Sequence, residues 1–219
     1  MAEFDLQHTD RLLTTTRAVR KRLDLSRPVD TSVVLDCLRI ASQAPTGSNS
    51  QKWRWMVVTD AEKKRRLGAY YSKSFEDYMA PKRELIAPGD VASLKMTDSA
   101  GYLAEHLSEV PVLVIPCVLD RLTPQSSAEE QASLYGGILP AVWSFQLALR
   151  SRGLGSAWTT LHLNFEREIG EVLGIPDTVT QVALLPVAYY TGEGFQSARR
   201  RPIEQVTYWN EWKTTTQAP

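Results

Sequence analysis

The sequence predicts an α+β protein in which helices cover both faces of a central sheet. Some segments repeat apolar residues at spacings of three and four, which is the pattern of an amphipathic helix. Others are compact runs of β-branched and aromatic residues, which favour strands. The two kinds of segment do not alternate strictly. This disfavours a parallel βαβ sheet and favours an α+β arrangement with about three to five strands.

The clearest helix begins after the RPVD turn. Apolar residues from Val33 to Ala41 recur on one face, and Asp30 or Thr31 can cap its start. Pro45 ends it, because the residue before a proline disfavours the helical conformation. The expected helices cover residues 9–19, 31–44, 61–79, 98–108, 133–151 and 164–176, with Asn164 expected to cap the last of these.

Strands are expected at 53–58, 110–119 and 178–190, with a short extended piece at 156–160. Pro111 and Pro116 predict that the second strand is short or lies at a sheet edge, because proline cannot donate to a ladder. Residues 80–97 contain two prolines and a glycine and predict a loop or lid, and residues 121–131 predict a polar loop. Pro140 must either kink its helix or lie in the first turn.

The overall composition gives no support for a nucleic-acid partner, because 25 basic residues balance 25 acidic ones. The first residues are acidic and polar, and no run of about 18 apolar residues predicts a membrane span. Cys37 and Cys117 lie in apolar stretches and are expected to be buried free thiols. We therefore expect a reducing, cytoplasmic compartment. The three histidines match no metal-ligand spacing, so no metal is expected.

Three kinds of segment could hold a ligand. APTGSNSQKW (44–53) places small polar residues between a helix and a strand, and GLGSAWTT (153–160) suits a close approach of backbone to a ligand. Two basic runs, RAVRKR (17–22) and RRR (199–201), can bind phosphate or carboxylate. Each segment alone is equally compatible with a tight turn or a solvated surface. GxGxxG, GxxxxGK[ST] and GxSxG are absent, which argues against a Rossmann site, a P-loop and a nucleophile elbow.

In this order, the segments resemble those of the nitroreductase family of FMN-dependent enzymes. TTRAVRKRL (15–23) is similar to the family's N-terminal R-R-S-x-R signature, and APTGSNSQKWRWMVV (44–58) to its A-P-S-x-x-N-x-Q-P-W strand entry. RGLGSAW (152–158) is similar to the end of the helix that precedes the flavin-contacting segment, and ARRRPIEQV (198–206) to the C-terminal basic phosphate contact. The resemblance covers nearly the whole chain.

The resemblance implies a nitroreductase-like three-layer fold, with a mostly antiparallel central sheet flanked by helices. It implies one FMN-binding domain over residues 1–219 and an intertwined homodimer, with the tail from about residue 199 packed on the partner chain. Two FMN sites would lie at the interface, each built from both chains.

Carried over by position, the basic ends of the chain would hold the FMN phosphate and pyrimidine oxygens. The polar turn would come from the partner chain, and two threonines would lie near the flavin N5. The implied cofactor-binding residues are Arg17, Ala18, Arg20, Pro45, Thr46, Gly47, Asn49, Thr159, Thr160, Arg199 and Arg200. The register leaves Arg20 and Lys21 as alternatives, and Lys52 stands where many members have proline. No catalytic side chain is implied, because the flavin carries the chemistry.

The implied activity is an NAD(P)H oxidoreductase of the nitroreductase type. Hydride would pass from NADH or NADPH through FMN to a nitroaromatic, quinone or similar small-molecule acceptor, in a ping-pong sequence. Reductive dehalogenation, flavin cleavage, azoline oxidation and a non-catalytic flavin-binding or redox-sensing role are the alternatives, and a deazaflavin could replace FMN. The aromatic residues of segment 61–79 could line the substrate slot or form core; they are Tyr70, Tyr71, Phe75 and Tyr78.

Overall fold

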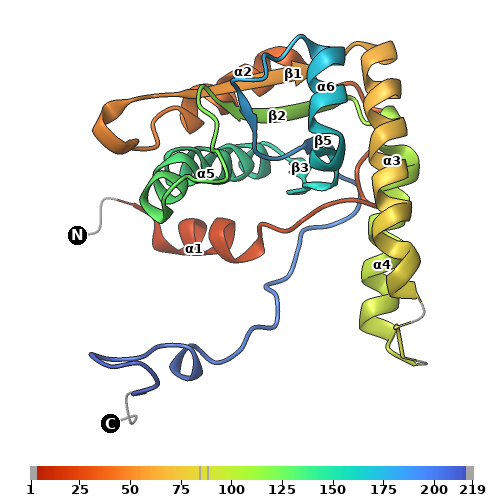
Figure 1. Cartoon of the computed structure of the whole chain (residues 1–219). Coiled ribbons are helices and arrows are strands. Elements are labelled where there is room, and N and C mark those ends of the chain that lie inside the picture. The colour runs from red at the N-terminus through yellow and green to blue at the C-terminus, as the bar shows by residue number, and fades with distance from the viewer. Residues whose placement is uncertain (1–3, 84, 88, 216–219) are drawn as a thin grey trace. The chain divides into compact units, whose positions relative to one another are not determined.

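The computed structural model describes residues 4–83, 85–87 and 89–215. The chain forms two compact units, one of Thr16–Glu193 and one that combines Met1–Thr15 with Gly194–Pro219. The larger unit contains the sheet and all but one of the α-helices of the described residues (Figure 1). The expectation of a single domain over the whole chain stays a prediction.

The larger unit is built on a five-stranded antiparallel sheet with the strand order β1-β2-β5-β3, and β4 pairs with β2. Its strands are β1 (Trp53–Val58), β2 (Val112–Val118), β3 (Leu154–Ser156), β4 (Thr180–Gln181) and β5 (Leu185–Tyr189). In the β1–β2 register Trp53 lies opposite Val118 and Val58 opposite Leu113. The α+β class and the antiparallel sheet are thus confirmed.

The prediction that the strand at 110–119 is short or lies at a sheet edge is wrong. Strand β2 is central and all seven of its residues are buried. Pro111 precedes the strand, and Pro116 lies opposite the interval between β4 and β5. The carbonyl of Pro116 accepts a hydrogen bond from Val182 N at 2.9 Å. Because the N–H and C=O of one residue point to the same side of a strand, the missing N–H falls where the ladder is already interrupted.

The single strand expected at 178–190 is divided into β4 and β5. Between them, Leu184 pairs with Thr159 rather than with β2. The pairing of Leu184 with Thr159 connects the sheet to the turn that follows β3. Thr159 is one of the predicted site residues.

Six α-helices occur among the described residues, and two follow the sequence expectation closely. The six helices are α1 (Leu6–Thr15), α2 (Thr31–Ala41), α3 (Ala61–Arg83), α4 (Val91–His106), α5 (Ala128–Ser151) and α6 (Glu166–Leu173). Asp30 caps α2 by accepting from Ser32 N at 2.8 Å. Gly153 and Gly174 have the positive φ expected past the ends of α5 and α6. Asn164 does not cap α6, because its amide donates instead to Ser74 Oγ at 2.7 Å.

The lid predicted at residues 80–97 is wrong for most of its described part. Helix α3 continues through Pro81 to Arg83, and α4 begins at Val91 after an Asp90 cap. Pro81 lies near the end of α3, where few intrahelical bonds follow it. Residues 84 and 88 lie outside the described residues. The two helices run side by side as an antiparallel pair (Figure 1).

Helix α5 is the central helix of the larger unit. It begins with a capping box of Ser127 and Glu130, five residues before the predicted start, and it continues through Pro140. By length and composition α5 could cross a membrane, but a buried core helix meets the same test. Its buried face includes Ile138 and Phe145, which share one hydrophobic core with α2 and the sheet.

The two cysteines are buried free thiols, as predicted. Cys37 belongs to the core between α2 and α5, and Cys117 lies on β2. Burial raises the pKa of both thiols, that of Cys117 to about 12. Both thiols are therefore protonated at neutral pH and are poor nucleophiles.

Gly155 allows the N-terminal basic segment to approach β3. A Cβ atom on Gly155 would lie 2.9 Å from Val19 Cβ, closer than ordinary contact. We predict that Gly155→Ala lowers the free energy of unfolding by about 1–3 kcal/mol through overpacking. Gly47→Ala is the matched control, because a Cβ there meets nothing within 4 Å. Urea denaturation of both variants checks this prediction, and equal midpoints would contradict it.

Candidate functional site

The N-terminal basic segment extends the sheet at the β3 edge. Ala18 forms a parallel bridge with Ser156, and Val19 N donates to the Ser156 carbonyl at 2.8 Å. Further along, Leu23 pairs with Tyr190, just after β5. Backbone hydrogen bonds therefore fix Arg17 and Arg20 beside the residues that follow β3.

The basic side chains of this segment differ in what they contact. Arg22 Nε donates to the Thr191 carbonyl at 2.7 Å, and its Nη2 donates to the Glu193 carbonyl. Lys21 forms an ion pair with Asp98 of α4. These two side chains stabilise the fold of the larger unit.

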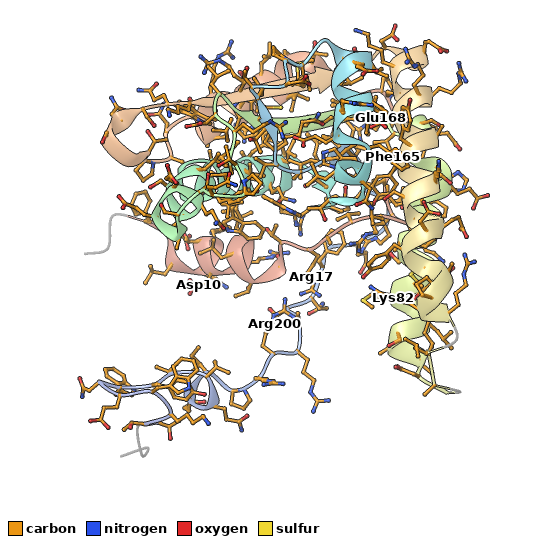
Figure 2. The ribbon with its side chains drawn as sticks, in the orientation of Figure 1. Asp10, Arg17, Lys82, Phe165, Glu168 and Arg200 are labelled. Atoms are coloured by element: carbon orange, nitrogen blue, oxygen red, sulfur yellow. The ribbon has the colours of Figure 1, made fainter. Side chains whose placement is uncertain are left out.

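Arg17 and Arg20 are half-buried, and neither forms a hydrogen bond or ion pair with any described residue. Figure 2 labels Arg17 where the chain leaves α1. A half-buried guanidinium group without a partner is unfavourable unless an anion or water satisfies it. Between the two alternatives for the second basic contact, the structure favours Arg20 over the paired Lys21.

The two threonines after β3 have different roles. Thr159 is buried, its amide donates to the Leu184 carbonyl at 3.2 Å, and its hydroxyl donates to the same oxygen at 2.7 Å. Thr160 is exposed, and in the described part of the chain neither its amide nor its hydroxyl donates a hydrogen bond. Thr160 is therefore the residue of the pair that can donate to a bound molecule.

Tyr71 of α3 connects the basic segment with this turn. The side chain is 3% exposed, and its hydroxyl lies within hydrogen-bonding reach of the Thr159 side chain. Burial raises the pKa of Tyr71, while the hydrogen bond with Thr159 and the charge of Arg20 act in the opposite direction. The structure thus brings Arg20, Tyr71 and Thr159 into one neighbourhood.

Of the four aromatic residues expected to line a slot, Tyr71 and Phe75 are core residues. The Phe75 ring lies against Gly101 of α4, where an added Cβ atom would be 3.4 Å from the ring. Tyr70 lies against Phe165, with ring centroids 5.3 Å apart. Tyr78 is 49% exposed, and Lys82 Nζ lies 3.3 Å from the centre of its ring.

The predicted polar turn, residues 45–49, precedes β1 at the opposite edge of the sheet. Its 3₁₀ turn η1 (Gly47–Asn49) is held by Gln51, whose amide donates to Thr46 Oγ at 3.2 Å and whose side chain donates to Asn49 Oδ1 at 2.8 Å. The turn borders a cavity of about 650 Å³ between the ends of β1 and β2 and the first half of α5. Lys52 lines the same cavity and pairs with Asp120 at 2.7 Å.

The two halves of the predicted site therefore do not meet within the larger unit. Thr46 and Gly47 lie before β1, while Arg17, Arg20 and Thr160 lie beyond β3, at the other end of the strand order. Strands are spaced about 4.8 Å apart, so three intervening strand steps alone separate the two halves by roughly 14 Å. Arg199 and Arg200 are exposed residues of the smaller unit, which is described by itself.

Sequence reasoning missed the residues that hold the turn after β3. Leu184 pairs with Thr159, and Ser74 of α3 contacts the 3₁₀ turn η3 (Leu161–Phe165). Neither residue has a motif around it. The only feature of the sequence that pointed to contacts of α3 with this turn was its set of aromatic residues, which is equally typical of core packing.

The profile described as "Nitroreductase family" matches residues 13–189. The chain belongs to the nitroreductase family.

Relatives of this nitroreductase-family protein include two kinds of enzyme by name. Iodotyrosine deiodinase of Drosophila melanogaster is 27% identical over 175 residues, or 79% of this chain and 59% of that protein. The chain thus matches less than two thirds of that deiodinase's length. NADH dehydrogenase of Thermus thermophilus is 30% identical over 211 residues, which cover 88% of this chain and 94% of the relative.

Solved structures share the fold of this nitroreductase-family chain. An iodotyrosine deiodinase bound to FMN and 3-iodo-L-tyrosine superposes with a TM-score of 0.69 at 22% identity, covering 91% of this chain and 99% of that one. A nitroreductase-like protein from Bacillus cereus gives 0.66 at 18% identity, covering 96% and 99%. The expected nitroreductase-like arrangement of sheet and helices is therefore confirmed.

His162, two residues after Thr160, makes the site region sensitive to acid. The side chain is fully buried, neither ring nitrogen hydrogen-bonds to a described residue, and burial lowers its pKa from 6.5 to about 4. In the unfolded chain His162 therefore binds a proton below about pH 6.5. In the folded chain it binds that proton only below about pH 4. We predict that stability falls as pH drops through this window, by up to about 1.4 kcal/mol per pH unit.

Urea denaturation between pH 7.5 and 4.5 measures this dependence. His162→Leu should flatten it over the window, because the variant has no imidazole to protonate at this buried position. An identical pH slope in wild type and His162→Leu would show that His162 is not the group responsible.

Proposed function

We propose that the protein is an FMN-dependent oxidoreductase that takes hydride from NADH or NADPH and acts as a homodimer. The observation that carries this proposal is the pair of half-buried guanidinium groups, Arg17 and Arg20, that lack partners among the described residues beside the exposed Thr160. Basic side chains that bind an anion next to a free hydrogen-bond donor are the arrangement that a phosphorylated flavin needs.

The residues of the chain fit FMN in charge and in hydrogen-bonding capacity. Arg17 and Arg20 would hold phosphate and pyrimidine oxygens, with Arg199 and Arg200 as further contacts, and the exposed Ala18 lies between the first two. Thr160 would donate toward N5. When bound, FMN supplies the hydride chemistry. The protein binds and orients it, and these positive charges favour the reduced, anionic ring.

A homodimer would complete this site. Because the polar turn and the arginines lie at opposite edges of one sheet, a second copy is the natural source of Pro45, Thr46, Gly47 and Asn49. Helix α5 supports this proposal: Tyr135, Leu139 and Trp143 recur every four residues and are 39–44% exposed. In the smaller unit, Tyr208, Trp209 and Trp212 are also exposed. A partner chain would cover such surfaces. A cytoplasmic location remains part of the proposal.

The proposed acceptor is a nitroaromatic compound, a quinone or a similar planar molecule. Relatives named NADH dehydrogenase and putative NAD(P)H nitroreductase support a nicotinamide donor. The second candidate is reductive dehalogenation, in which a carbon–hydrogen bond replaces a carbon–halogen bond and halide leaves. It is favoured by the several relatives named iodotyrosine deiodinase.

Steady-state assays of the FMN-loaded protein separate these activities. The proposal expects NADH or NADPH oxidation that requires nitrofurazone or menadione, with parallel double-reciprocal lines, because the sequence has no separate dinucleotide fingerprint. Release of iodide from 3-iodo-L-tyrosine under dithionite, without such oxidation, would favour dehalogenation. FMN binding without either reaction would indicate a flavin-binding protein that does not turn over.

The arginines provide a direct test of cofactor binding. We predict that Arg17→Ala and Arg20→Ala each weaken FMN binding roughly tenfold to a hundredfold, because a charge-assisted hydrogen bond contributes about 1.5–3 kcal/mol. Arg200→Ala should act in the same direction. Arg39→Ala is the matched control, since Arg39 is exposed and pairs with Asp36. Titration by flavin fluorescence measures the dissociation constants, and wild-type affinity in both Arg17→Ala and Arg20→Ala would rule out the anion-binding role.

A further inference from the structure

Ser74 lies in the middle of α3 and both of its hydrogen bonds go to the turn that follows Thr160. The residue is fully buried. Its hydroxyl donates to the Leu161 carbonyl at 2.7 Å and accepts from Asn164 Nδ2, also at 2.7 Å. A buried hydroxyl with both contacts in one short turn holds that turn at a defined distance from the helix.

Neighbouring residues of α3 contact the same segment. The hydroxyl of Tyr71, one turn earlier, lies within hydrogen-bonding reach of the Thr159 side chain. Tyr70 stacks against Phe165, and Lys73 Nζ lies 5.1 Å from the centre of the same ring. Figure 2 shows Phe165 between α6 and α3. One face of α3 thus contacts the segment from residue 159 to residue 165.

These contacts fix both neighbours of Thr160. On one side, Thr159 is bonded to Leu184 through its amide, its hydroxyl and its carbonyl. On the other side, the Leu161 carbonyl is held by Ser74. Thr160 itself is exposed and donates no hydrogen bond within the described residues. The Thr160 amide shares a planar peptide with the Thr159 carbonyl, which accepts from Leu184 N at 2.9 Å, so that bond sets the amide direction. The hydrogen bond from Ser74 to Leu161 instead fixes the chain just beyond the Thr160 side chain.

We propose that Ser74 is a positioning residue that aims the Thr160 hydroxyl at the flavin. This inference rests on the proposed function. Ser74 does not touch the cofactor; it acts through Leu161. Because the phosphate is assigned to Arg17 and Arg20, loss of the Ser74 hydroxyl changes the properties of the bound flavin more than it changes flavin affinity. The Ser74 hydroxyl also links the α3–α4 helix pair to the part of the site proposed to lie near the flavin N5.

The test compares Ser74→Ala with Ser72→Ala, a matched control on the same helix whose side chain bonds to no described residue. The readouts are the FMN dissociation constant and the two-electron midpoint potential of bound FMN, which requires no turnover. For Ser74→Ala we expect affinity within about threefold of wild type. We expect the equilibrium to shift toward the reduced form by fivefold to tenfold, tenfold being about 30 mV. The oxidised N5 would accept a hydrogen bond that a misplaced Thr160 hydroxyl no longer supplies.

Asn164→Ala is the second variant, and it keeps the test valid if Ser74→Ala folds poorly. Asn164 is exposed, and its removal frees the Ser74 hydroxyl to rotate while leaving the fold intact. A shift of about twofold to threefold in the same direction is expected. Wild-type potentials in both variants, with or without a loss of thermal stability, would overturn the inference and leave only a structural role for Ser74. Failure of the wild type to bind FMN would instead reject the proposed function.

Discussion

The candidate site depends on the backbone hydrogen bonds at the β3 edge of the sheet. Val19 N donates to the Ser156 carbonyl, and Thr159 exchanges hydrogen bonds with Leu184. These bonds place a basic segment from the start of the chain beside a turn from its second half. Each bond contributes only about 1 kcal/mol to stability, but together they define which side chains lie next to each other. Gly155 permits this approach because it has no side chain to meet Val19.

The same sheet separates the two halves of the site. Its strand order places the polar turn before β1 at one edge and the arginines beyond β3 at the other. The proposed site needs both halves, and in the proposed dimer a second chain would supply the missing one. This constraint gives the proposed dimer a functional reason, in addition to the need to cover apolar residues such as Trp143 on α5.

Local signals in the sequence predicted the elements that depend on local physics. Strand β1 was expected at its observed bounds, and Asp30 caps α2 as expected. The errors arose where tertiary contacts override a local rule. Pro116 lies in a central strand because its missing N–H faces an interruption of the ladder.

The candidate site shows the same difference between what local sequence predicts and what tertiary contacts decide. The residue types of the basic segment predicted an anion site, but the sequence did not show which of its side chains are available. Lys21 is paired with Asp98 and Arg22 with carbonyls near Thr191, and these partners lie 77 and 169 residues away. Ser74 could not be predicted at all, because a serine within a helix has no local feature that distinguishes it from its neighbours.

In the proposed dimer, each flavin site takes its arginines from one chain and its polar turn from the other. Two variants test this arrangement: Arg17→Ala with Arg20→Ala in one chain, and Gly47→Trp in the other, at a position where a Cβ atom meets nothing within 4 Å. Each variant alone should fail to retain FMN. A heterodimer isolated through two affinity tags should bind about one FMN per pair of chains, because one of its two sites is intact. A heterodimer that binds no FMN would contradict the claim.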